Sequence, residues 1–163
     1  SDTAPSLVAL EAEMVISRDG KTRKMPAEKF FIGPATDITR MTALKKNDIL
    51  VEIRLPKKWA GAKYYFEKVA DRQTWDFSLV NIAMVAKTSG GKIADLRMAC
   101  GGVQCTPRRM TNVEDLLKGE SAGAEMEKLS KRVAAQGAKA LNYNHFKIPL
   151  MGSLAARAVR SLS

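Results

Sequence analysis

The chain has 163 residues, a length that fits one domain or two small ones with a hydrophobic core. Hydrophobic residues make up 45% and charged residues 27%, an ordinary globular composition, and no apolar run approaches the roughly 20 residues that span a bilayer. The formal net charge of +10 is spread along the chain, without the dense basic stripe or aromatic platforms of nucleic-acid binders. We therefore disfavour nucleic acid as a partner and favour docking on an acidic protein surface.

The N-terminal segment has neither an initiator Met nor the basic start and cleavage site of a signal peptide. We expect a cytoplasmic location, and a chain that is either processed or a piece of something longer. Cys100 and Cys105, with the lone His145, fall short of a four-ligand zinc site. Without a secretory signal, we interpret both thiols as reduced and structural.

Turn residues and hydrophobic patterns predict the secondary structure of the first part of the chain. Residues 7–16 predict a helix followed by a strand, and the Asp19-Gly20 turn predicts a hairpin between strands at 12–17 and 21–25.

Residues 48–56 alternate with a period of two, which predicts a strand that ends at Pro56. The alternation places these apolar residues on one face: Ile49, Val51, Ile53 and Leu55. Leu50 is the one apolar residue on the polar face, so we expect something other than the main core to cover it.

The second part of the chain reads as strands followed by helices. The strands are expected at 62–70, 77–88 and 92–103, and the helices at 111–119, 121–140 and 147–162. Because strands and helices are segregated rather than alternating, the order predicts an α+β fold. We expect a first antiparallel sheet, then a three-stranded antiparallel sheet packed with the C-terminal helices.

Three charges at every fourth position, Lys68, Arg72 and Asp76, would share one face of a helix. Their neighbours Val69 and Phe77 instead favour an extended chain. We therefore interpret the stretch as a strand end, a polar loop and a new strand. A charged loop between buried strands is a common place for function.

The sequence lacks the familiar motifs of nucleotide binding and hydrolysis. It contains no G-x-G-x-x-G, P-loop, nucleophile elbow or H-E-x-x-H, and its single His supports no His-dependent triad. Gly101-Gly102 has no capped helix directly after it. We interpret this pair as a close backbone approach or a strand bulge rather than a phosphate loop.

At this loop a family resemblance becomes visible. The segment "AKYYFEKVADRQTWDFSLVNIAMVA", followed by "KIADLRMACGGVQCTPRRMTNVEDLLKG", resembles the C-terminal domain of the FAD-binding subunit of molybdenum hydroxylases, the xanthine dehydrogenase and carbon monoxide dehydrogenase family. The shared pattern consists of Lys68, Arg72, Asp76, Gly101, Gly102, Val103, Pro107, Arg109, Glu114, Leu117 and Gly119. Residues 1–61 resemble the C-terminal part of a FAD-binding domain, and 62–163 resemble the C-terminal domain.

The resemblance implies cofactor-binding roles for three residues. Asp2 matches a position that approaches the flavin, Leu50 one that packs on the isoalloxazine ring, and Lys68 a lysine near that ring. Arg72 and Asp76 are then interpreted as a loop-fixing ion pair. From the residues alone, a helix cap, an ordinary core leucine and a solvated edge charge remain the alternatives.

The resemblance also implies a function and partners. It implies a part of an oxidoreductase complex that passes electrons from [2Fe–2S] clusters through FAD to NAD or another acceptor. The expected partners are the N-terminal half of the FAD subunit, a molybdopterin-binding large subunit and a [2Fe–2S] small subunit. The glycine-rich segment for the FAD pyrophosphate is absent, so we expect little FAD binding by this chain alone. The alternative is a non-catalytic assembly module of the same fold that binds acidic partners.

Overall fold

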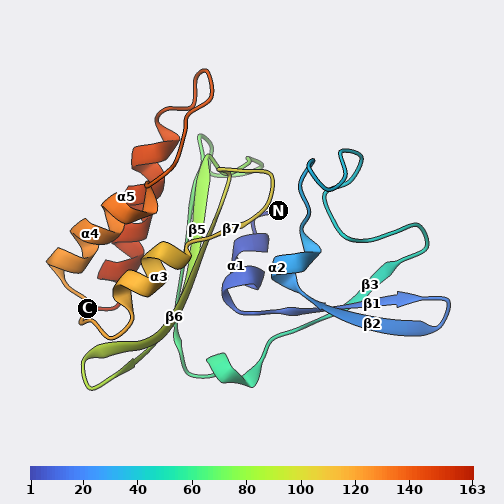
Figure 1. The fold of residues 1–163 in the computed structure, drawn as a ribbon, viewed down its shortest axis with the longest axis horizontal. Helices are drawn as coiled ribbons and strands as arrows, with labels where there is room; N and C mark the ends of the chain where they lie inside the picture. Colours follow the sequence, from blue (N-terminus) through green and yellow to red (C-terminus); the bar gives the residue numbers. More distant parts are fainter.

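Two antiparallel sheets form the framework of the chain, which the computed structural model describes over residues 1–163 (Figure 1). The smaller sheet has the order β2-β1-β3 and the larger one β4-β5-β6-β7. The strands are β1 Glu13–Arg18, β2 Lys21–Pro26, β3 Ile49–Arg54, β4 Lys63–Val69, β5 Val80–Ser89, β6 Lys92–Gly101 and β7 Arg108–Arg109. The helices are α1 Ala4–Ala9, α2 Ala27–Phe30, the 3-10 turn η1 Lys57–Trp59, α3 Thr111–Leu117, α4 Ala124–Ala134 and α5 Lys147–Arg160.

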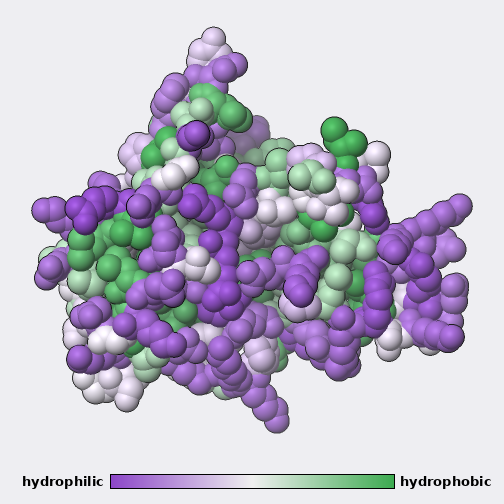
Figure 2. Space-filling model, viewed as in Figure 1, coloured by the Kyte–Doolittle hydropathy of each residue, from purple (hydrophilic) through white to green (hydrophobic).

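The predicted N-terminal hairpin is confirmed. Asp19 and Gly20 connect β1 to β2 and both have positive φ, 49° and 75°, as a two-residue turn with the right twist for a hairpin requires. β2 is exposed along most of its length, and hydrophilic side chains cover the hairpin end of the molecule at the right of Figure 2. β2 therefore adds little to the core.

Helices α3, α4 and α5 cover one face of the larger sheet (Figure 1). The fully buried side chains between them include Ile82 and Met84 of β5, Met98 of β6, and Leu154 of α5. The predicted α+β class and the antiparallel sheet with C-terminal helices are confirmed. The sheet has four strands rather than three, because Arg108–Arg109 pairs with the end of β6.

The opposite face of the larger sheet packs against the N-terminal third of the chain. Here Ala83, Val85 and Ala99 contact a second core cluster with α1, β1, α2 and the indole of Trp59. Arg97 on β6 crosses this boundary: its guanidinium donates to the Val8 carbonyl at 3.2 Å and to a Glu28 carboxylate oxygen at 3.1 Å. Apolar packing and a buried arginine therefore both join the two sheets.

The side chains of β3 are not arranged as the alternation predicted. The strand forms as predicted, but Ile49, Val51, Ile53 and Leu55 are 44–65% exposed rather than buried. The register of β1 and β3 shifts between Val15 and Ile16, so the strict alternation is broken by a bulge. The prediction that these four residues share one face is therefore wrong: the bulge interrupts the alternation, and all four side chains remain exposed.

The bulge also explains the odd position of Leu50. This residue pairs with Ile16, which is fully buried, and Leu50 packs against the same N-terminal core cluster. Leu50 is therefore covered by the smaller core, between the two sheets.

Both cysteines are free thiols. Cys100 is buried under α5, where burial raises its pKa to about 12 and keeps the thiol protonated. Cys105 is exposed in the loop after β6. None of the helices has the length and apolar character needed to cross a membrane.

Candidate functional site at the start of helix α1

Strand register places the candidate residue Lys68 in one row with a buried asparagine and a glycine across the larger sheet. Lys68 on β4 lies opposite Asn81 on β5, and Asn81 lies opposite Gly101 on β6. Because directly paired residues of antiparallel strands point to the same face, the Lys68 and Asn81 side chains share the face on which α1 packs. The charged loop Ala70–Leu79 begins immediately beyond this row.

Asp2, just before α1, meets this row. The Lys68 ammonium donates to Asp2 Oδ2 at 2.7 Å, across 66 positions of sequence. The other carboxylate oxygen, Oδ1, lies 3.4 Å from Ser78 Oγ and 3.5 Å from Asn81 Nδ2. The side chains of Lys68 and Asp2 remain 28% and 44% exposed, so this ion pair borders solvent and can reach a ligand.

Gly101 allows this close packing. A Cβ at this position would lie 2.4 Å from Asn81 Oδ1 and 3.0 Å from Pro5 Cγ, which no ordinary side chain permits. Asn81 is only 2% exposed, and its Oδ1 has no hydrogen-bond donor. This supports the interpretation of the Gly101-Gly102 pair as a site of close backbone approach, and it identifies a buried polar atom with unused capacity.

The loop after β4 also holds Lys68 in place, in addition to the contact with Asp2. Lys68 Nζ also donates to the backbone carbonyl of Asp76. Within the loop, the Arg72 N–H donates to Asp76 Oδ2 at 2.8 Å, and the Arg72 guanidinium lies 3.6 Å from the other carboxylate oxygen. The hydrogen bond from the Arg72 backbone N–H is shorter than the side-chain ion pair, so it contributes more to holding Arg72 and Asp76 together. The loop therefore holds Lys68 at the edge of the sheet.

The Asp76 contact predicts a pH dependence. The Arg72 backbone N–H, with help from the guanidinium charge, holds the pKa of Asp76 below its ordinary value of about 3.9. A depressed pKa means that the contact stabilises the loop fully above pH ~3.9 and is lost as the pH falls through the lower folded-state value. We expect the Arg72 amide resonance to titrate with a midpoint below 3.9 in ¹⁵N-edited NMR spectra. The Asp76→Asn variant should abolish that titration, and a midpoint at or above 3.9 would contradict the account.

The sequence-predicted site residues separate into two groups. Asp2 and Lys68 are in direct contact, whereas Leu50 lies on β3 in the other sheet and is not part of this cluster. A hollow of about 270 Å³ adjoins the cluster, with Ser1, Ala4 and Gly101 in its lining together with residues of the 31–42 and 102–107 segments.

Asn81 and Ser78 were missed at the sequence level. A signal for Asn81 was present: it is the single polar residue in the apolar run "LVNIAMVA" of the central strand. Its position opposite Lys68 depends on the strand register, which the sequence did not define. Ser78 carries no such signal.

Comparison with protein families gives two matches that together span most of the chain. The family described as "CO dehydrogenase flavoprotein C-terminal domain" matches residues 64–161. The family described as "FAD binding domain in molybdopterin dehydrogenase" matches residues 1–58. Asp2 lies in the second match and Lys68 in the first, so their ion pair joins the two matched regions.

Several characterised relatives are similar in sequence. The carbon monoxide dehydrogenase medium chain of Hydrogenophaga pseudoflava is 32% identical over 114 residues, 70% of this chain and 38% of the relative. The glyceraldehyde dehydrogenase medium chain of Sulfolobus acidocaldarius is 31% identical over 137 residues, 83% of this chain and 46% of the relative. The chain thus spans less than half the length of these relatives.

Solved structures agree with the fold. The chain superimposes on a chain of the Hydrogenophaga pseudoflava carbon monoxide dehydrogenase that lacks the Mo-pyranopterin moiety, with a TM-score of 0.83 and 28% identity, over 98% of this chain and 55% of that one. A chain of quinoline 2-oxidoreductase from Pseudomonas putida 86 gives a TM-score of 0.85 at 20% identity, over 99% of this chain and 55% of that one. At this low sequence identity, the similarity to quinoline 2-oxidoreductase shows a shared fold only.

Proposed function

The chain belongs to the CO dehydrogenase flavoprotein family, the FAD-binding medium subunits of molybdenum hydroxylases, and from this premise we propose that it forms one wall of a flavin site. The observation that carries the proposal is the ion pair of Asp2 and Lys68, which joins the two family-matched regions at an exposed edge of the sheet. We also propose that the chain divides into 1–61, the end of a FAD-binding domain, and 62–163, the C-terminal domain.

The residues present fit the ring end of FAD. Lys68 offers a cation and Asp2 a carboxylate acceptor, both partly exposed, and the buried Asn81 Oδ1 lacks a donor. No arginine belongs to this cluster, and the six-residue helix α1 is too short to present a strong N-terminal anion site. The groups that would hold the pyrophosphate therefore belong to another part of the subunit.

FAD, when bound, supplies the electron-transfer chemistry. The role of this chain is electrostatic and positional. The Lys68 ammonium would stabilise the negative charge that a reduced flavin ring carries at neutral pH, and the Asp2 carboxylate and the Asp76 carbonyl fix the direction of the ammonium. Leu50 remains proposed as an apolar contact for the ring.

The exposed apolar side chains of β3 support a larger subunit. Ile49, Val51, Ile53 and Leu55 lie on or just after an edge strand of the smaller sheet, within the region that matches the FAD-binding domain. An exposed apolar edge strand is a common place for another chain segment to pair. We propose that the N-terminal half of the FAD subunit covers this face.

The complete assembly is proposed by analogy with the family. A large subunit with molybdopterin would oxidise the substrate, and a small subunit with [2Fe–2S] clusters would carry electrons to FAD. FAD would then reduce NAD or another acceptor. The positive charge of this chain suits docking on acidic partner surfaces.

Flavin content tests the proposal. In a subunit with the full length of its relatives, we expect about one FAD per chain by absorbance after purification, and little FAD bound to the 163-residue chain alone. A Val51→Asp substitution on the exposed face of β3 should lower the flavin content, whereas Lys87→Asp on the exposed end of β5 should not. A full-length subunit that neither carries FAD nor takes it up on reconstitution would favour the non-catalytic module instead.

A further inference from the structure

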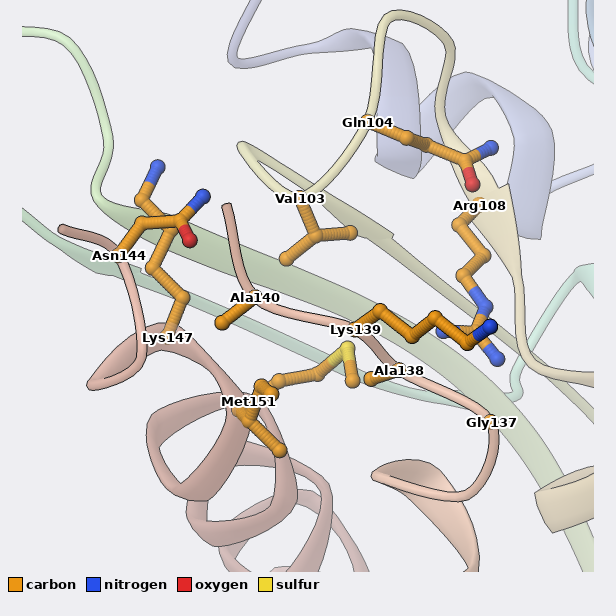
Figure 3. A pocket seen from close by; sticks show the side chains of 11 residues that line it. Val103, Gln104, Arg108, Gly137, Ala138, Lys139, Ala140, Asn144, Lys147 and Met151 are labelled. Carbon is orange, nitrogen blue, oxygen red and sulfur yellow. The ribbon is translucent and has the colours of Figure 1, made fainter. Parts of the chain in front are cut away.

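A second polar site lies on the opposite, helix-covered face of the larger sheet. A pocket of about 210 Å³ opens between the loop after β6, the strand β7 and the start of α5 (Figure 3). Its apolar floor includes Val103 and Met151, which belong to or pack on the core under the helices. The Asp2–Lys68 pair lies on the other face of the sheet, so the two sites are separate.

Three cations from three different segments line this pocket. They are Arg108 of β7, Lys139 of the loop between α4 and α5, and Lys147 at the first position of α5. Figure 3 shows Arg108 and Lys139 directed toward the same end of the pocket, and Asn144 and Lys147 at the other end. The lining contains no Asp or Glu, so nothing in the pocket neutralises these charges.

Arg108 differs from most other arginines of the chain because it has no carboxylate partner. Most arginines of the chain pair with a carboxylate, including Arg109, the immediate neighbour of Arg108, at 2.7 Å from Glu114. Arg108 and Lys139 form no ion pair, and Lys147 donates to the backbone carbonyl of Gly102 at 2.8 Å. Arg108 is half-buried and Lys139 is exposed, and their side chains point toward the same end of the pocket without a counter-ion there. A bound anion would reduce the repulsion between these two charges.

From this arrangement we propose that the pocket binds a small phosphorylated molecule through its phosphate group. The planar arginine fork and the compact ammonium group are the side chains that proteins use for phosphate, and the two positive charges of Arg108 and Lys139 match a dianion better than a monocarboxylate. The volume is below the ~300–1,000 Å³ of pockets for drug-sized ligands, so the ligand is compact. The apolar floor would contact a short carbon body attached to the phosphate.

Calorimetry and NMR on the 163-residue chain test the proposal at constant ionic strength. The probes are inorganic phosphate, glycerol 3-phosphate and acetate. We expect saturable binding of both phosphates, weaker binding of acetate, and shifted amide resonances near Val103, Arg108 and Lys139. Tighter binding of glycerol 3-phosphate than of inorganic phosphate would assign the apolar floor to the carbon body, and equal binding would assign the site to the phosphate group alone.

Charge-neutralising variants give the decisive comparison. Arg108→Gln and Lys139→Gln should each weaken phosphate binding by about tenfold, because each removes a charged hydrogen-bond donor. Arg132→Gln is the matched control: this arginine on α4 also lacks an ion pair, but it lies outside the pocket. Equal effects of all three variants, no saturable phosphate binding, or acetate binding as tight as phosphate binding would overturn the proposal.

Discussion

Replacement of Glu114 by Ala is expected to destabilise the fold by about 3 kcal/mol, which corresponds to a fall in Tm of about 10 °C for a chain of this size. Glu114 is 7% exposed and lies on α3 against the larger sheet. Its carboxylate accepts from the Met98 N–H at 3.0 Å and from two guanidinium nitrogens of Arg109 at 3.1 and 2.7 Å. Removal of the carboxylate leaves a buried N–H and a half-buried cation without an acceptor.

Asp115 provides the matched control on the same helix. It is exposed and forms no ion pair, so Asp115→Ala should change the free energy of unfolding by less than about 0.5 kcal/mol. Chemical denaturation monitored by circular dichroism measures both variants. Similar losses in the two variants would show that a feature shared by both carboxylates, such as their negative charge near the start of α3, rather than the Glu114 contacts determines the result. The family pattern of Arg109 and Glu114 would then need another explanation.

Replacement of Lys68 by Met is expected to make the reduction potential of the bound FAD more negative by some tens of millivolts in the full-length subunit. The change removes a positive charge that would stabilise the reduced ring, and about 1–2 kcal/mol of lost stabilisation corresponds to roughly 20–45 mV for a two-electron couple. Lys68 is the appropriate target because Asp2 and the Asp76 carbonyl hold its ammonium in place. Spectroscopic redox titration of the purified flavoprotein measures the shift.

A purely structural role of Lys68 would give a different result. Lys68→Arg keeps the charge and should restore most of the potential, and Lys87→Met, on an exposed part of β5, should leave it unchanged. A potential that stays constant in Lys68→Met, while thermal stability falls, would assign the lysine to the fold alone.

Local signals were sufficient to predict most elements of the chain. The Asp19-Gly20 turn predicted the hairpin because both residues accept positive φ. The segregation of strands and helices predicted the α+β class. β7 escaped prediction because two residues, Arg108 and Arg109, carry no periodic signal and become a strand only by pairing with the end of β6.

The error at β3 has a different origin. Alternation alone cannot show a bulge, and the shift between Val15 and Ile16 directed Leu50 rather than its apolar neighbours toward the core. A run of alternating apolar residues also suggests that a strand is covered, but it does not identify the segment that covers it. On β3 and just after it, Ile49, Val51, Ile53 and Leu55 are exposed in residues 1–163.

The candidate site was only partly accessible to sequence reasoning. The family pattern brought Asp2 and Lys68 to attention, but their contact depends on how α1 packs against β4 and β5. The phosphate pocket had no motif at all, because Arg108, Lys139 and Lys147 come to line one pocket only in the folded chain. Tertiary packing, which composition and periodicity do not describe, determines both sites.

The most direct test of the account is the position of the isoalloxazine ring in an experimental structure of the full-length subunit with FAD. We predict that the ring lies against the Asp2–Lys68 edge, with the Lys68 ammonium within hydrogen-bond distance of a ring heteroatom. A ring bound elsewhere, with Lys68 still engaged only by Asp2 and the Asp76 carbonyl, would contradict the proposed role of this edge.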